Sequence, residues 1–198
     1  MYFFISSFNF NLNPLSEKTK MIEVEAKVKI PNPSLLKKKI QSIAKFKTRE
    51  KKTDTYYTLE SKNKYPKKSL RIRKTNHTYE INFKQKLSYI KNIHAKKEKE
   101  FRVSDMKNFL DLINDFGFRK WLTKTKHSEI YQIKKNFHIE INHVQSLGWF
   151  LEIEYLAQNK TQIQKARTQI LSILKKLNIN KNQIIKDGYT KLLWDKKH

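Results

Sequence analysis

The chain contains no cysteine and few glycine, proline or acidic residues. Without cysteine it can form neither a disulfide framework nor a thiol nucleophile. Its three glycines cannot build the glycine-rich loop that cradles phosphates in many nucleotide-binding proteins. No apolar run approaches the roughly 20 residues of a membrane-spanning helix, and the apolar start of the chain lacks the basic segment of a signal peptide. We therefore expect a cytoplasmic protein with no membrane partner.

Acidic residues are scarce relative to basic ones: 18 aspartates and glutamates stand against 43 lysines and arginines, a net charge of +25. Such an excess favours an anionic partner, including polyphosphate or nucleic acid as a secondary possibility. Drift toward a lysine-rich composition is the competing explanation, because asparagine and isoleucine are also abundant. Arginine discriminates better, since planar guanidinium groups bind phosphate oxygens bidentately. Arg71 and Arg73 stand one residue apart.

The first 20 residues differ in composition from the rest of the chain. We expect residues 1–20 to be a disordered extension or an upstream start read into the chain, followed by a single domain over residues 21–198. Alternation of apolar and polar residues predicts strands over 21–30, 48–59, 69–74, 79–86, 96–103, 118–134, 138–144 and 148–156.

Between the predicted strands, amphipathic spacing predicts helices over 34–46, 105–116 and about 161–177, with a short final helix. The expected N-caps are Asn32, Ser104 and Thr161, and Gly117 is expected to end the second helix. We expect a hairpin turn at Asn76 and a loop over 87–94. No parallel βαβ rhythm is present, so the predicted fold class is antiparallel α+β.

Paired glutamates with a one-residue gap are the most informative pattern, and they occur as Glu23/Glu25, Glu98/Glu100 and Glu152/Glu154. Alternate residues of a strand share one face, so each pair places two carboxylates side by side. Carboxylate oxygens at this spacing suit a divalent cation.

One face of the predicted sheet is charged and the other apolar. The charged face holds Glu23, Glu25, Lys27, Arg71, Arg73, Lys84, Lys86, Glu98, Glu100, Lys124, Lys126, Glu140, Glu152 and Glu154. A half-exposed sheet whose polar side meets water is one interpretation. The other is a closed barrel of about eight strands, whose interior can hold one small ligand. Inward charges are costly to bury unless they pair or hold ions, and a metal-bound triphosphate would satisfy both signs.

Several segments resemble the CYTH superfamily, the triphosphate tunnel metalloenzymes, over residues 21–194. Glu23-Val24-Glu25-Ala26-Lys27 is similar to the family's first-strand signature. The other similar segments are Asp54-Thr55-Tyr56-Tyr57, Leu70-Arg71-Ile72-Arg73, Ile81-Asn82-Phe83-Lys84, Glu98-Lys99-Glu100, Leu147-Gly148-Trp149-Phe150-Leu151-Glu152-Ile153-Glu154 and Gly188-Tyr189-Thr190-Lys191-Leu192-Leu193. The last of these is common in the branch that resembles class IV adenylyl cyclases.

The resemblance implies an eight-stranded antiparallel β-barrel, the triphosphate tunnel, with helices packed outside. It implies a site for Mg²⁺ or Mn²⁺ at Glu23, Glu25, Glu152 and Glu154, with Glu98, Glu100 and Asn142 as further metal-site residues. It implies triphosphate binding by Lys27, Arg71, Arg73, Lys84, Lys86, Lys124 and Lys126. Of these, Lys27, Lys84 and Lys126 are the candidate catalytic residues.

Two positions depart from the family pattern. Ser128 stands where the family's sixth strand usually has arginine, and Asn142 stands where it has aspartate. Lys124 shares the face of Ser128 and could compensate in part, without a bidentate fork. An amide oxygen can ligate a metal, but it lacks the negative charge and the basicity of a carboxylate.

Three functions remain open at this point. One is a class IV adenylyl cyclase-like enzyme that converts ATP to cyclic AMP and pyrophosphate. Another is a triphosphatase that hydrolyses tripolyphosphate, thiamine triphosphate or a nucleoside triphosphate. The last is a non-catalytic binder of polyphosphate or nucleic acid. The histidines, including His138 and His143, are expected to be solvated or structural, and the sequence is compatible with a monomer or a homodimer.

Overall fold

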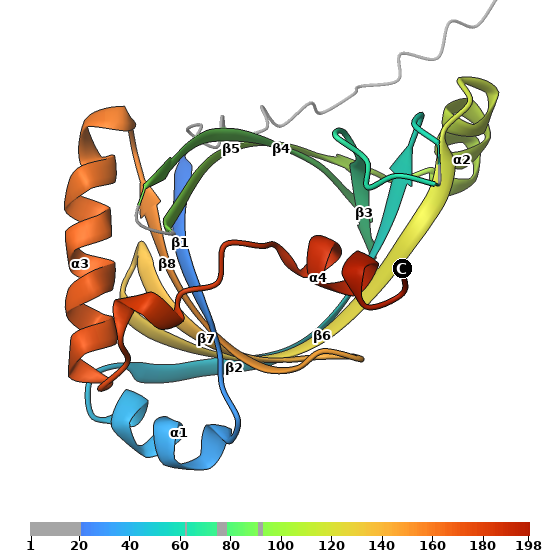
Figure 1. Cartoon of the computed structure of the whole chain (residues 1–198). Coiled ribbons are helices and arrows are strands. Elements are labelled where there is room, and N and C mark those ends of the chain that lie inside the picture. Colours follow the sequence, from blue (N-terminus) through green and yellow to red (C-terminus); the bar gives the residue numbers. More distant parts are fainter. Residues whose placement is uncertain (1–20, 62, 75–78, 91–92) are drawn as a thin grey trace, which may run out of the picture.

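Eight antiparallel strands form a closed barrel in the computed structural model of the protein (Figure 1). The structure describes residues 21–61, 63–74, 79–90 and 93–198, and for residues 84–90 and 94–98 it describes the backbone alone. The expected extension over 1–20 and the expected turn at Asn76 lie outside the described residues.

The strands are β1 (Ile22–Lys29), β2 (Lys45–Thr58), β3 (Leu70–Lys74), β4 (Tyr79–Ile90), β5 (Ile93–Val103), β6 (Arg119–Lys134), β7 (Phe137–Val144) and β8 (Gly148–Ala157). They follow one another around the barrel in the order β1-β5-β4-β3-β2-β6-β7-β8. Closure comes from β1, which pairs with both β5 and β8. The antiparallel α+β class and the barrel expected from the resemblance are confirmed.

Four helices accompany the strands in the described part of the chain: α1 (Pro33–Gln41), α2 (Met106–Asp115), α3 (Ile163–Lys176) and α4 (Tyr189–Asp195). In Figure 1, α1, α2 and α3 lie outside the ring of strands, whereas α4 lies across one opening. The helices outside the barrel are as expected, but α4 differs because its segment crosses an end of the barrel. Within the described residues, no helix is both long enough and apolar enough to cross a bilayer.

The main hydrophobic core lies between the outer face of the barrel and the helices. Val24 and Ile153 of the barrel are fully buried against the inner face of α3, where Ile170 is equally buried, and α1 contributes Ile40 to the same cluster. Burial of each such side chain contributes about 1.5–3 kcal/mol. A smaller cluster joins Ile72 and Ile81 of the barrel to Ile113 of α2. Because the apolar side chains take the outer face, the alternating charged residues must face inward.

Four local predictions need correction. The helix expected over 34–46 ends at Gln41, and residues 45 and 46 belong to β2. In the segment expected to be a loop over 87–94, residues 87–90 and 93–94 are strand, since β4 continues to Ile90 and β5 begins at Ile93, and residues 91–92 lie outside the described residues. A register shift between Lys86 and Ser88 interrupts the alternation there, which hides the strand signal. The N-cap of α2 is Asp105, which is one residue after the expected Ser104.

Helix α3 also begins differently from the prediction. A 3₁₀ turn, Lys160–Gln162, precedes it, and the Asn159 side chain caps this turn through the Thr161 amide. The helix itself starts at Ile163 without a side-chain cap. Gly117, in contrast, follows α2 as predicted, and its φ of 86° is in the left-handed region that favours glycine.

Candidate functional site: a charged tunnel

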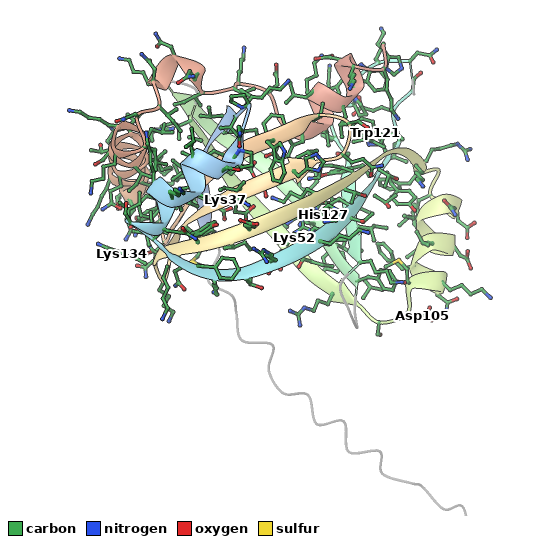
Figure 2. The ribbon with its side chains drawn as sticks, turned by 90° about the horizontal axis from the view of Figure 1, so that it is seen from below. Lys37, Lys52, Asp105, Trp121, His127 and Lys134 are labelled. Atoms are coloured by element: carbon green, nitrogen blue, oxygen red, sulfur yellow. The ribbon has the colours of Figure 1, made fainter. Side chains whose placement is uncertain are left out.

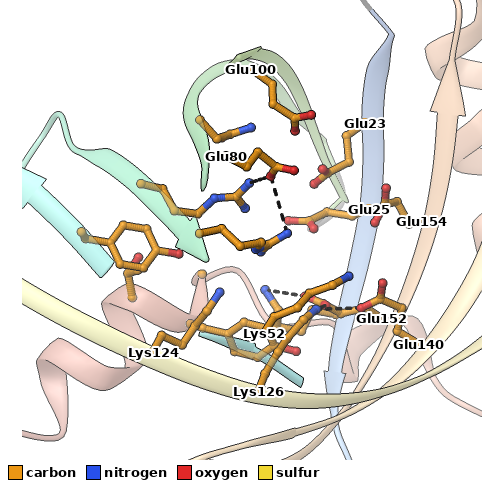
Figure 3. Close-up of a pocket in the computed structure, with 18 of the residues that line it drawn as sticks. Glu23, Glu25, Lys52, Glu80, Glu100, Lys124, Lys126, Glu140, Glu152 and Glu154 are labelled. Carbon is orange, nitrogen blue, oxygen red and sulfur yellow. Dashed lines mark hydrogen bonds and ion pairs between the residues drawn. The ribbon is translucent and has the colours of Figure 1, made fainter. Parts of the chain in front are cut away.

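The interior of the barrel is a cavity of about 1000 Å³, and charged side chains line most of its wall (Figure 3). The two signs of charge are segregated. Carboxylates come mainly from β7, β8, β1 and β5, which are consecutive around the barrel, and cations come mainly from β3, β2 and β6, which are also consecutive. We call these two surfaces the acidic wall and the basic wall.

The acidic wall consists of Glu23, Glu25, Glu100, Glu140, Glu152 and Glu154. Strand register brings them together: Glu25 stands opposite Glu154, and Glu140 stands opposite Glu152. The glutamates of β1 and β8 therefore share one wall, as the resemblance implied. Burial has the largest upward effect on the pKa of Glu152, and the like charges of Glu25 and Glu140 add to that effect. Lys126 and Lys27 outweigh these effects, so the pKa of Glu152 is lowered overall.

The basic wall consists of Lys52, Arg71, Arg73, Lys124 and Lys126. Two carboxylates within this wall position the arginines. Asp54 accepts hydrogen bonds from Arg73 Nε at 2.6 Å and Arg73 Nη2 at 3.0 Å, and Glu80 accepts one from Arg71 Nη2 at 2.9 Å. Lys124 Nζ lies 2.9 Å from Asp54 Oδ2. The two guanidinium groups, which line the cavity, are thus held in fixed orientations.

Asp54 is fully buried, so its charge depends on these partners. Burial alone would raise the pKa of Asp54, but Lys124 and Arg73 outweigh it and hold the pKa well below its ordinary value. Asp54 raises the pKa of Arg73 in turn, against the effect of burial. The Asp54 carboxylate and the Arg73 guanidinium are therefore charged at neutral pH.

Lys126 connects the two walls. Its Nζ lies 2.7 Å from Glu140 Oε2 and 3.2 Å from Glu152 Oε2. Burial would lower the pKa of Lys126, but these two carboxylates raise it above its ordinary value. Burial would raise the pKa of Glu140, but Lys126 lowers it to about 2. Asn142 Nδ2 donates to the same two oxygens, at 3.2 Å and 2.7 Å.

The segment that leads into α4 closes one end of the cavity. Ile185 N–H donates to the Lys27 carbonyl, which ties this segment to β1. The Tyr189 ring packs edge-to-face on Phe150 at 4.9 Å between centroids, and Lys27 Nζ lies 4.1 Å from its centre. Burial, followed by the charge of Glu152, raises the pKa of the Tyr189 hydroxyl well above its ordinary value.

The structure brings most of the predicted site residues to the cavity: Glu23, Glu25, Lys27, Arg71, Arg73, Glu100, Lys124, Lys126, Glu152 and Glu154 line it. Asn142 is buried against two of them. The side chains of Lys84, Lys86 and Glu98 lie outside the described part of the structure, although their backbones belong to β4 and β5. Their predicted roles, like those of the other residues, remain predictions.

The sequence-based site omitted Asp54, Glu80, Lys52, His138 and Tyr189, all of which bear on the cavity. Strand alternation could have found four of them, because residues two apart on a strand share one face. Lys52 and Asp54 are two apart on β2, as are Glu80 and Asn82 on β4 and His138 and Glu140 on β7. Tyr189 has no such signal, since its position depends on the path of the chain after α3.

The fold and the site together define a class: antiparallel barrels that face their charged residues into an enclosed tunnel and their apolar residues outward. The chain belongs to the CYTH domain family, whose model matches residues 21–189. Proteins of this family act on triphosphate substrates with divalent metal ions.

Similar proteins cover most of the chain. "Putative adenylate cyclase MJ0240" of Methanocaldococcus jannaschii is 29% identical over 175 residues, which span 87% of this chain and 98% of that protein. The solved structure of the PH1012 protein of Pyrococcus horikoshii is 28% identical, with a TM-score of 0.71, and the match covers 86% of this chain and 98% of that one.

A more distant structure has the same fold. It is that of HpAC1 from Hippeastrum, described as a putative adenylyl cyclase with a dominant triphosphatase activity. It is 12% identical with a TM-score of 0.61, and the match covers 89% of this chain and 95% of that one.

Proposed function

We propose that this protein is a metal-dependent enzyme that acts on a small molecule containing a triphosphate. One observation carries the proposal: an acidic wall and a basic wall face each other across a single cavity of about 1000 Å³. Charged side chains that face an enclosed space without counter-charge cost free energy, so each wall favours a ligand of the opposite charge. A triphosphate with a bound divalent cation supplies anionic oxygens to one wall and a cation to the other.

The acidic wall has the donor set that Mg²⁺ or Mn²⁺ prefers, because it offers several carboxylates from adjacent strands. Glu23, Glu25, Glu152 and Glu154 are the proposed ligands, with Glu100 close by in Figure 3. A bound ion would neutralise charge on the phosphate oxygens and help to orient them. Asn142 donates its amide hydrogens to Glu140 and Glu152, so in this arrangement it orients carboxylates and its Oδ1 remains available.

The basic wall would bind the phosphates. Arg71 and Arg73 are held by Glu80 and Asp54, and this preorganisation means that little side-chain entropy is lost when phosphate binds. Lys124 and Lys126 extend the same wall, and Lys27 of β1 lies near them, with its Nζ 3.3 Å from Glu152 Oε1 and, like that of Lys124, close to the Tyr189 ring. Stabilisation of developing negative charge by such fixed cations is the main source of acceleration in phosphoryl transfer.

The reaction that we favour is the formation of cyclic AMP from ATP. The ribose 3′ oxygen would attack the α-phosphorus in line and lose its proton, while the bond to the β-phosphate oxygen breaks and pyrophosphate leaves. The relative from Methanocaldococcus jannaschii, described as a putative adenylate cyclase at 29% identity, supports this choice. Lys27 and Lys126 are the proposed catalytic lysines, with Lys84 as the third candidate, and they would neutralise charge on the reacting phosphates.

A triphosphatase in the same tunnel is the second candidate, with water attacking the terminal phosphorus. The charged walls would bind the triphosphate and make no contact that we assign to the group attached to it, so they would serve either reaction. The triphosphatase activity described for the distant structure from Hippeastrum belongs to a protein that shares the fold alone.

A substrate screen with product identification tests the proposal. ATP, tripolyphosphate and thiamine triphosphate would each be incubated with Mg²⁺ or Mn²⁺, and cyclic AMP, pyrophosphate and orthophosphate would be measured. We expect cyclic AMP from ATP, and loss of turnover in Glu25→Gln and Glu152→Gln. Orthophosphate without cyclic AMP would favour the triphosphatase, and inertness toward all substrates would exclude both reactions.

Polyanion binding without turnover is the remaining alternative, and it makes a distinct prediction. A surface that binds long polyanions should do so with steep salt dependence. The variants Glu25→Gln and Glu152→Gln separate binding from turnover. If they abolish metal-dependent turnover but still bind polyphosphate, polyphosphate binding is not the function of the tunnel.

A further inference from the structure

His138 lies at the edge of the acidic wall, where two carboxylates face its ring. It precedes Glu140 by two residues on the same face of β7, and it stands directly opposite Glu154 on β8. His138 Nε2 lies 3.5 Å from Glu154 Oε1. One donor atom from each of these three residues lies within 4.8 Å of the other two, and all three residues line the cavity.

The separations fit a shared ion. Ligand atoms held about 2.0–2.2 Å from one metal lie about 3–4.4 Å apart in tetrahedral or octahedral geometry. The 3.5 Å between His138 and Glu154 is within that interval, and the upper limit of 4.8 Å for the triad requires only small side-chain adjustments. The strand register fixes all three backbones, so the cluster does not depend on a loop.

Ligand chemistry then selects among metals. Mg²⁺ strongly prefers oxygen ligands and retains several waters, whereas imidazole nitrogen suits the later first-row divalent ions. A set of one imidazole and two carboxylates therefore favours ions from Mn²⁺ to Zn²⁺ over Mg²⁺.

We propose that His138, Glu140 and Glu154 bind a divalent first-row transition ion at the rim of the acidic wall. The proposal rests on the proposed function in that it gives the tunnel a preference for such ions over Mg²⁺. It adds a nitrogen ligand to a wall from which the sequence predicted carboxylate and amide ligands alone.

The neighbouring charges allow this role. The contacts described for Glu140 with Lys126 and Asn142 use Oε2, so Oε1 can take an ion without breaking them. His138 with two carboxylates carries a net charge of −2 when the ring is neutral. The nearby cations are Lys47, whose charge acts on His138, and Lys52 and Lys126, whose charges act on Glu140. Lys126 is shared between Glu140 and Glu152.

A simple ion pair between protonated His138 and Glu154 is the alternative explanation. It accounts for the 3.5 Å contact but requires no third group, and it predicts that metal ions leave the His138 ring unaffected. The cluster also explains why spacing along the sequence gave no histidine site. One partner is only two residues away on the same strand, and the other comes from the next strand.

Cobalt binding to the full chain without substrate tests the proposal, because Co²⁺ reports its ligands through visible absorption. Titration calorimetry with Co²⁺ and with Mg²⁺ would be carried out on the protein, on His138→Gln and on His143→Gln. His143 is the matched control, since it lies on the same strand and its ring packs on Trp149 at 4.8 Å between centroids. Circular dichroism would establish that each variant is folded.

We expect His138→Gln to weaken Co²⁺ binding by at least about tenfold, since loss of even an outer-sphere partner costs about that much. Mg²⁺ binding should change far less, and His143→Gln should bind Co²⁺ as the parent does. Glu154→Gln should weaken Co²⁺ binding as well. Unchanged Co²⁺ affinity or an unchanged visible spectrum in folded His138→Gln would overturn the proposal. Because no substrate is present, that result would leave the proposed triphosphate chemistry standing, and an inert enzyme would leave the metal result standing.

Discussion

Ser128 on β6 and Asn142 on β7 stand directly opposite each other in the antiparallel register. Both are buried, with exposures of 2% and 0%, and strand alternation puts Ser128 on the face of Lys126 and Asn142 on the face of Glu140. These are the two positions at which the chain departs from the pattern that it resembles, which has arginine and aspartate there. A single departure would leave one charge buried without its neighbour. The two together replace a potential charge pair with a neutral pair, so we predict that the two positions are energetically coupled.

A double-mutant cycle at these positions tests the coupling. Asn142→Asp would add a third carboxylate beside Glu140 and Glu152, and we expect it to lower the free energy of unfolding by about 2–4 kcal/mol, equivalent to a pKa raised by two to three units. Adding Ser128→Arg should recover at least about 1 kcal/mol of that loss. Urea denaturation of the two single variants and the double variant measures this, and strictly additive effects would contradict the coupling.

Asp54 is the anchor of the basic wall, and its removal should be costly. Asp54→Asn keeps the shape of the side chain but leaves Arg73 and Lys124 without their shared counter-charge in a buried position. Breaking a buried pair in this way costs about 3–5 kcal/mol. Asp111→Asn is a suitable control, because Asp111 is exposed on α2, outside the barrel interior. Equal midpoints of thermal unfolding for the two variants would contradict the assigned role.

The same carboxylate predicts a pH dependence with a definite sign. The pKa of Asp54 is lower in the folded state than its ordinary value of 3.8, so the folded state binds fewer protons than the unfolded state at acidic pH. Its contribution is therefore fully present above about pH 5 and is lost progressively as the pH falls through and below 4. The difference in unfolding free energy between the parent and Asp54→Asn should shrink from pH 6 to pH 3. A difference that grows toward acid would contradict the assignment.

Much of the barrel and half of the charge arrangement could be predicted from strand alternation alone. Glu23, Glu25 and Lys27 alternate with fully buried apolar residues, and a closed barrel is one of two ways to place such a strand. Alternation fails where the register shifts, as between Lys86 and Ser88. It also says nothing about partners on other strands. Asp54 and Arg73 are 19 residues apart in sequence, and only the order of strands around the barrel makes them neighbours.

Tyr189 illustrates a second limit of sequence analysis, because no local sequence pattern predicts that the chain after α3 brings this residue to the end of the cavity. Its hydroxyl is buried near Asn142 without adequate hydrogen-bond geometry, while its ring packs on Phe150. Removing a buried, unsatisfied hydroxyl is nearly neutral, so Tyr189→Phe should change the unfolding free energy by less than about 1 kcal/mol. Tyr189→Ala should lower it by about 3–5 kcal/mol, because the ring is lost from a packed cluster. Comparable losses in both variants would show that the hydroxyl is bonded.

Divalent ions should stabilise the fold through the acidic wall. Glu25 and Glu140 act on Glu152 with like charge, so a bound ion relieves repulsion in the folded state alone. Mass action then adds about 2.7 kcal/mol at an ion concentration 100 times the dissociation constant. We expect Mn²⁺ to raise the midpoint of thermal unfolding and a chelator to reverse the rise.

Glu25→Gln should remove most of this shift, because it deletes a ligand. It should also raise the midpoint slightly in the absence of metal, because it deletes a like charge. Asp111→Asn, on the exposed face of α2, should retain the full shift. A shift that survives in Glu25→Gln would place the ion elsewhere than the acidic wall, and the phosphate chemistry proposed for the tunnel would then lack its metal.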